Sequence, residues 1–133
     1  MSRRHDRGSA VVELVLIAPL LVLVLMFLVV VGRLAEARLQ LSEAAHSAAR
    51  AASLAAGPAQ ARNAASAALD SLPASAACVR RDVKVDSSKF ELGGAVRIVV
   101  SCHIRLDDLA GLVPGTTTIT ESSVSPIDPF RAG

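Results

Sequence analysis

Residues 7–33 read RGSAVVELVLIAPLLVLVLMFLVVVGR, and this stretch decides how the chain is organised. From Leu14 to Val31 there are 18 consecutive residues with no charged or hydrogen-bonding side chain. As an α-helix they cover about 27 Å of the roughly 30 Å hydrocarbon layer of a bilayer. The stretch therefore predicts a transmembrane helix over residues 9–32, with a long signal sequence as the other interpretation of the same pattern.

The composition of the whole chain favours the same class of protein. The length of 133 residues allows one small domain, and 52% of the residues are hydrophobic, yet there is no Trp, no Tyr and only three Phe. The apolar content is therefore Ala, Val and Leu, which is typical of long helices and membrane spans rather than of an aromatic core.

The charges indicate an orientation and exclude one class of partner. Arg3, Arg4 and Arg7 precede the apolar run, so the amino terminus is predicted to be cytoplasmic and the rest of the chain extracytoplasmic. Three of the 14 basic residues and one of the 12 acidic residues lie in residues 1–8, which leaves the remainder of the chain with balanced charge. Without a basic patch or aromatic side chains, binding to nucleic acid is not expected.

The helix is expected to continue far beyond the membrane. Residues 1–8 are predicted to be a leader peptide, and the helix to run from Ser9 to Ala56, with residues 33–56 as its extracytoplasmic continuation. Its length would be about 72 Å, and Gly57-Pro58 is the break that ends it. An apolar stripe at heptad spacing predicts the buried face. Its members are Leu34, Ala37, Leu41, Ala44, Ala48, Ala51 and Ala55.

Residues 57–133 are predicted to form a small α+β region. Residues 57–73, GPAQARNAASAALDSLP, favour a short second helix with Ala61, Ala65 and Leu69 on its apolar face. Residues 79–86, 95–106 and 116–124 favour strands, separated by turns at Gly93-Gly94 and Pro114-Gly115. The fold class is thus α+β, with about three antiparallel strands, and residues 125–133 are expected to be a loose tail.

Two cysteines, Cys78 and Cys102, lie on the side that is predicted to be exported. An even number of cysteines in an oxidising compartment predicts one disulfide, worth about 3 kcal/mol for a loop of this length. Two buried free thiols are the alternative. A metal site is not expected, because Cys78, Cys102 and His103 supply too few ligands.

Residues 8–13, GSAVVE, lie directly before the apolar run. This placement of Gly and Glu resembles the processing site of the type IV prepilins, in which a membrane peptidase cuts after the Gly. The longer stretch resembles, more narrowly, the TadE-like proteins of the tight-adherence (Tad) pilus systems. The matching positions are Arg7, Gly8, Ser9, Val12, Glu13, Pro19, Leu20, Leu21, Gly32 and Arg33.

The resemblance implies a pilin-like fold and a role without catalysis. It implies a minor pilin, or pseudopilin, that takes part in pilus assembly at the bacterial inner membrane, possesses no cofactor, and is cut between Gly8 and Ser9 by a prepilin peptidase. The other implied partners are pilin and pseudopilin subunits, the Tad assembly machinery and membrane lipid.

Glu13 is the residue whose role the spacing explains best. One helical turn separates it from Ser9, and a carboxylate inside a membrane costs on the order of 3 kcal/mol. In packed subunits of the implied kind, the Ser9 ammonium of a neighbour offsets that cost and sets the register. The alternative is that Glu13, only about 6 Å inside the apolar edge, reaches back to water. Pro19 frees the Val15 carbonyl and predicts a helix kink.

Two other kinds of protein fit parts of the pattern. One is a secreted protein whose first segment is a signal peptide, cut near Ala35-Glu36-Ala37. The other is a single-span anchor that holds a binding module outside the cell without processing. An enzyme is not expected, because His46, His103 and Asp107-Asp108 lack the context of a catalytic or metal site and fit surface or turn positions.

Overall fold

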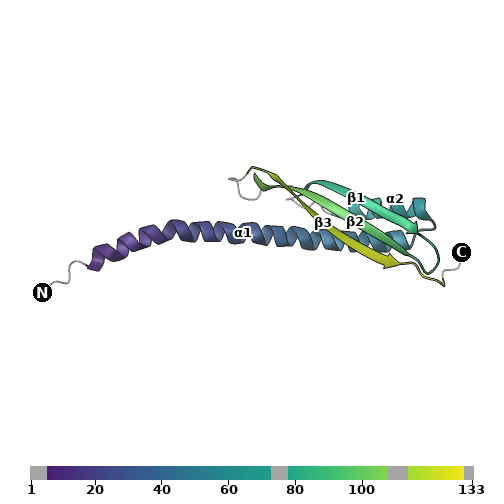
Figure 1. Ribbon diagram of the computed structural model, residues 1–133, viewed down its shortest axis with the longest axis horizontal. Coiled ribbons are helices and arrows are strands. Elements are labelled where there is room, and N and C mark those ends of the chain that lie inside the picture. Colours follow the sequence, from purple (N-terminus) through teal and green to yellow (C-terminus); the bar gives the residue numbers. More distant parts are fainter. Residues whose placement is uncertain (1–5, 73–77, 108–113, 131–133) are drawn as a thin grey trace.

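Two helices are followed by an antiparallel sheet in the computed structural model, which describes residues 6–72, 78–107 and 114–130 and the side chains from Val11 onward. Figure 1 shows one long helix that projects from a small domain formed by the other elements packed along its second half. The predicted α+β class is confirmed. The elements are α1 (Asp6–Ser53), α2 (Pro58–Asp70), β1 (Cys78–Lys89), β2 (Ala95–Arg105) and β3 (Thr116–Pro126).

Helix α1 has the predicted length of 48 residues, but it begins and ends three residues earlier than expected. The chain turns between Leu54 and Gly57, and Pro58 disfavours helical backbone at the residue before it, so α1 and α2 are not continuous. Gly57 is accordingly extended, with φ −169°. The helix is continuous through Pro19, and it is gently bowed in Figure 1.

Helix α2 folds back along α1. Pro58 occupies the first turn, and Ala61, Ala65 and Leu69 are buried, as the sequence predicts. The carboxyl end of α2 is bound by Arg81 of β1, whose Nη1 donates a hydrogen bond of 2.9 Å to the Leu69 carbonyl. An arginine at this position satisfies a terminal carbonyl and complements the helix dipole. The range predicted for this helix, residues 57–73, ends at Pro73, which lies outside the described residues.

The sheet has the order β1-β2-β3, with both neighbouring pairs antiparallel. Strand β2 is central, and its alternation of apolar and polar residues correctly predicts the buried face. Gly93 takes a positive φ of 78° in the turn between β1 and β2. The residues of β2 that are buried against the helices are Val96, Ile98, Val100, Cys102 and Ile104.

The expectation of a loose tail from Ser125 is wrong for its first residues. Strand β3 continues to Pro126, and Ile127 is buried with 3% of its surface exposed. Its backbone N–H donates a hydrogen bond of 2.9 Å to the Gly94 carbonyl. Burial of the Ile127 side chain at the end of the core stabilises this segment, although the residues around it are polar or proline.

The buried face of α1 follows the straight-helix period rather than the predicted heptad. An α-helix drifts by about 20° per heptad from a repeat of 3.5 residues, so a heptad stripe leaves the interface along a straight helix. Ala51 and Ala55, at the far end of the predicted stripe, are therefore only half-buried. The buried apolar residues of α1 are Ala37, Leu41, Ala44, Ala45, Ala48, Ala49 and Ala52.

Small side chains at this interface determine how the layers pack. Helix α1 lies against β2, β3 and α2, and most of its buried positions are alanine. Alanine permits close approach of the two helices but contributes little buried area, so the larger residues of β2 supply most of the apolar volume. The core is thin, and it lies entirely on the second half of α1.

Candidate functional site

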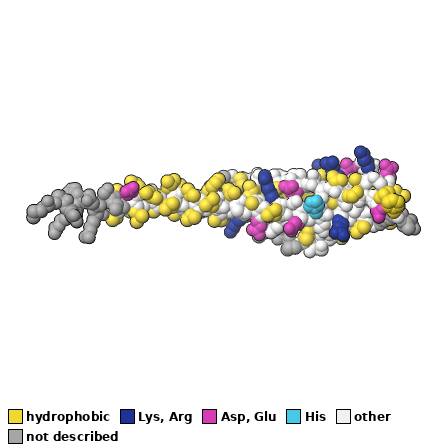
Figure 2. Space-filling model, turned by 90° about the horizontal axis from the view of Figure 1, so that it is seen from below, with side chains coloured by type: hydrophobic (Ala, Val, Ile, Leu, Met, Phe, Trp, Pro, Cys, Tyr) yellow, Lys and Arg dark blue, Asp and Glu magenta, His cyan; other side chains and the backbone are white. Residues whose placement is uncertain are grey.

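The first half of α1 presents its apolar side chains to the surroundings. Every residue from Val11 to Val29 is exposed, and the exposed fractions of Leu14, Leu16 and Phe27 reach 66–70%. Figure 2 shows these apolar side chains along the part of the helix that projects from the domain. The helix is long and apolar enough to cross a membrane, and, unlike the core helix of a soluble protein, no part of its most apolar stretch is buried.

Glu13 is the one charged residue between Val11 and Gly32. Its side chain is exposed on α1, near the amino-terminal end of the apolar surface. Gly8 and Ser9 belong to the first turns of the same helix, so the helical backbone places Ser9 one turn before Glu13. The side chains of residues 6–10 lie outside the described part of the structure.

The other residue singled out in the apolar run is Pro19, which is exposed within α1. A proline removes one backbone hydrogen bond and is tolerated in membrane helices when neighbouring groups satisfy the freed carbonyl. The kink expected at Pro19 stays a prediction, because the continuous helix does not test how it bends in a bilayer.

The apolar segment passes directly into the core of the domain. Leu34 is half-buried against that core, and Ala37 is the first fully buried residue of α1. Ala37 lies six residues after Val31, which is a rise of about 9 Å along the helix. The candidate membrane span and the domain are therefore parts of one rigid element, with Arg33 exposed between them.

Two polar contacts fix the domain end of α1 to β3. The Nδ1 of His46 lies 2.9 Å from the Oγ of Ser123, and Ser125 Oγ donates a hydrogen bond of 3.0 Å to Ser53 Oγ. His46 is exposed, as the sequence predicts, but its contact with Ser123 was not expected. Ser123 and Ser125 share the face of β3 that turns to the helix, and serines at alternate inward positions were the available signal.

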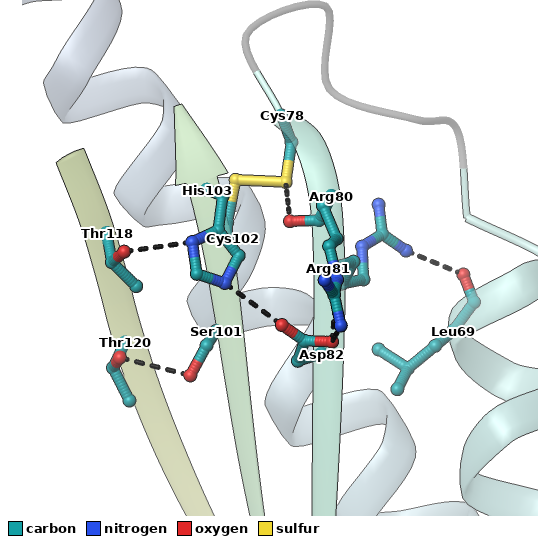
Figure 3. The surroundings of a disulfide bond; sticks show 10 residues. All are labelled: Leu69, Cys78, Arg80, Arg81, Asp82, Ser101, Cys102, His103, Thr118 and Thr120. Carbon is teal, nitrogen blue, oxygen red and sulfur yellow. Dashed lines mark hydrogen bonds and ion pairs between the residues drawn. A yellow bond between two sulfur atoms is a disulfide. The ribbon is translucent and has the colours of Figure 1, made fainter. Parts of the chain in front are cut away.

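The disulfide joins Cys78 to Cys102, with 5.6 Å between their Cα atoms (Figure 3). Cys78 pairs with Ile104, whereas Arg80 pairs with His103, so Val79 is an extra residue in β1. Because side chains alternate between the faces of a strand, this bulge moves Cys78 to the buried face that carries Cys102. The bridge and the bulge therefore depend on each other.

A hydrogen-bonded row crosses all three strands on the outer face of the sheet (Figure 3). The Nε2 of His103 lies 2.9 Å from Asp82 Oδ2 of β1, and its Nδ1 lies 3.0 Å from Thr118 Oγ1 of β3. The hydrogen bond from His103 holds the pKa of Asp82 below its usual value, with Arg80 adding its positive charge.

The row places a carboxylate, an imidazole and a hydroxyl in the order found in the catalytic triads of some hydrolases, but it lies on the outer face of the sheet. In such enzymes the hydroxyl lines a substrate cleft, whereas Thr118 is exposed on the outer face of the sheet. The side-chain hydrogen bonds of this row link the three strands to one another. Within the described ranges there is also no group of three or more His, Cys, Asp or Glu side chains placed to hold a metal ion.

Comparison with known proteins gives a family match. Residues 8–50 match the sequence profile of the family described as TadE-like protein, which confirms the resemblance to that family over this segment. The matched segment contains Gly8, Ser9 and Glu13, the whole apolar run, and the part of α1 that enters the core. A search of curated proteins and a search of solved structures found no match.

Proposed function

We propose that this chain is a non-catalytic minor pilin, or pseudopilin, that takes part in assembly of a Tad-type pilus at the bacterial envelope. The observation that carries the proposal is the exposed apolar run of α1, inside the segment that matches the TadE-like family. Glu13 is the one charged residue between Val11 and Gly32 of this run. Such a segment acts by packing among lipids and other helices, which requires no reactive group.

The proposed maturation is a cut between Gly8 and Ser9 by a prepilin peptidase. Both residues lie in the first turns of α1, where a helix end has unsatisfied backbone groups and opens readily. The cut would place a new ammonium on Ser9, one turn from Glu13. In an assembly of parallel helices, the ammonium of one subunit would pair with Glu13 of the next and fix their axial register.

The continuity of α1 supports an anchored protein over a secreted one. A signal peptidase acting after Ala37 would cut within the buried face of the helix and remove Leu34 from the core. In the proposed arrangement the span stays attached, the amino terminus is cytoplasmic, and residues 33–133 lie outside the inner membrane. Membrane lipid, other pilin or pseudopilin subunits and the Tad assembly machinery are the proposed partners.

The first experiment determines the amino-terminal residue and intact mass of the protein recovered from envelopes of its host. The proposal expects a chain that begins at Ser9, and a Gly8→Ala variant that keeps residues 1–8. A mature chain that begins at Arg38 would indicate a cleaved signal peptide. An uncut chain in the wild type would indicate a plain membrane anchor, and either result contradicts the proposed maturation.

A second experiment separates cutting from packing. Glu13→Gln keeps the size of the side chain but removes its charge, so cutting is expected to be normal while cross-linking between subunits falls. Glu36→Gln is the matched control, because Glu36 is an exposed glutamate of the same helix outside the apolar run. Equal cross-linking in the two variants would contradict the proposed role of Glu13.

A further inference from the structure

The end of the sheet formed by the carboxyl end of β2 and the start of β3 lies close to the candidate membrane boundary. Figure 1 shows this end projecting along α1, beyond the start of β1 and over the middle of the long helix. Its described residues are Arg105, Leu106 and Asp107 on one side and Pro114, Gly115 and Thr116 on the other, joined by a hydrogen bond of 2.9 Å from Leu106 N–H to the Gly115 carbonyl.

The contacts along α1 give the direction and the reach of this hairpin end. Ser125 bonds to Ser53 and Ser123 bonds to His46, so moving back along β3 leads toward the membrane. Thr116 lies seven residues before Ser123, a distance of about 23 Å along a strand. The same distance along α1 is about 15 residues, which leads from His46 to Val31. The oblique crossing of strand and helix shortens this reach by a few residues.

The burial of α1 agrees with this geometry. Val30 is half-exposed, whereas Val11 to Val29 and Val31 are all exposed. Val30 lies one helical turn before Leu34, which packs against the core, so the two side chains share one face. The surface of α1 that packs against the core thus begins at Leu34, one turn after the half-exposed Val30.

We propose that this hairpin end, defined as Arg105–Asp107 with Pro114–Thr116, rests on the outer surface of the bilayer that α1 crosses. The inference rests on the proposed transmembrane role of α1, and the occupant it assigns is the phospholipid headgroup layer. If the apolar run from Leu14 to Val31 fills the hydrocarbon layer, headgroups begin beside Gly32 and Arg33, at the level that the hairpin end reaches. The exposed Arg33 then lies where an arginine side chain favours phosphate groups. Arg105 lies at the same level, and its guanidinium is paired with the carboxylate of Asp107.

A second membrane contact has a physical consequence for the domain. With α1 as its only attachment, the domain would tilt with the helix equally in every direction. Contact of the hairpin end with headgroups favours tilt toward the side on which this end lies. The outer face of the sheet, with Asp82, His103 and Thr118, is then held at a fixed angle to the membrane.

The experiment uses tryptophan fluorescence, because the chain contains no Trp and no Tyr. The full-length protein is reconstituted in phosphatidylcholine vesicles whose acyl chains carry bromine near the headgroup, and the quenching of single tryptophans is measured. Pro114→Trp and Thr116→Trp report on the hairpin end, and using both guards against a fold defect in either. Leu92→Trp is the control at the opposite end of the sheet, where Leu92 is 64% exposed, and Phe27→Trp reports on the span.

The expected result is strong quenching of the tryptophan at position 27, and quenching at positions 114 and 116 that is several-fold greater than at position 92. If position 27 is quenched while positions 114 and 116 behave like position 92, the hairpin end does not touch the bilayer. This result would overturn the present inference and would still support a membrane-spanning α1. If position 27 is not quenched, α1 does not cross the bilayer, and the present inference fails together with the membrane part of the proposed function.

Discussion

Ser123 Oγ of β3 lies 2.9 Å from His46 Nδ1 of α1, so a hydrogen bond joins the sheet to the long helix across 77 positions of sequence. A bond of this kind between partly buried groups contributes about 1 kcal/mol to the free energy of unfolding. A double-mutant cycle of His46→Ala and Ser123→Ala should give a coupling energy near that value. Urea unfolding in detergent, followed by circular dichroism, measures it. Repeating the cycle with Ser47→Ala, an exposed neighbour, should give no coupling.

The contact between α1 and α2 depends on small side chains. Ala65 of α2 has no exposed surface, whereas Ala67 of the same helix is exposed. Ala65→Leu should therefore lower the free energy of unfolding by about 1–3 kcal/mol, the usual cost of overpacking. Ala67→Leu adds the same atoms without crowding and should leave stability nearly unchanged. Similar melting temperatures for the two variants would contradict close packing of these helices.

Loss of the disulfide should destabilise the domain by about 3 kcal/mol, the value for a loop of this length. The two serine variants should differ, because Cys102 is 3% exposed in the core while Cys78 is half-buried. Cys102→Ser also buries a hydroxyl and should be the less stable of the two. A reductant should lower the melting temperature of the wild type and leave both variants unchanged. Sensitivity of either variant to the reductant would contradict the pairing of these cysteines.

The outer row of the sheet predicts a dependence of stability on pH. The pKa of Asp82 in the folded chain lies below its usual value, first because of the hydrogen bond from His103. A carboxyl with a depressed folded pKa contributes stability above its unfolded pKa of about 3.9, and this contribution is lost as the pH falls through the folded pKa. Asp82→Asn should therefore weaken the fall in melting temperature below about pH 4. Asp70→Asn, on α2, is the control, and an equal effect there would contradict the role of the row.

Those parts of the fold that depend on local periodicity are predictable from the sequence. The alternation in β2 identifies its buried face, and the spacing of Ala61, Ala65 and Leu69 identifies the buried face of α2. In each case one face of a regular element is apolar, so the period alone decides which side is buried. Gly93-Gly94 marks the turn between β1 and β2.

Features that depend on a partner element are not predictable in this way. The bulge at Val79 follows from how β1 pairs with β2, and the polar contacts of His46 require β3 to cross the helix at that point. The heptad stripe on α1 is wrong at Ala51, because a helix that does not supercoil drifts away from a repeat of seven residues. Gly8, Ser9 and Glu13 are related by local spacing, and their roles in processing and packing stay predictions.

The uninterrupted course of α1 from the apolar run to Ser53 makes the helix a lever arm. The 21 residues after Gly32 carry the domain roughly 32 Å along the helix axis. A change of about 10° in the angle of the helix to the bilayer normal, within the usual range of tilts, moves the far end sideways by about 5 Å. A force applied to the domain is therefore transmitted as a torque to the segment that contains Glu13, and a change in how the membrane segments pack moves the domain as a whole.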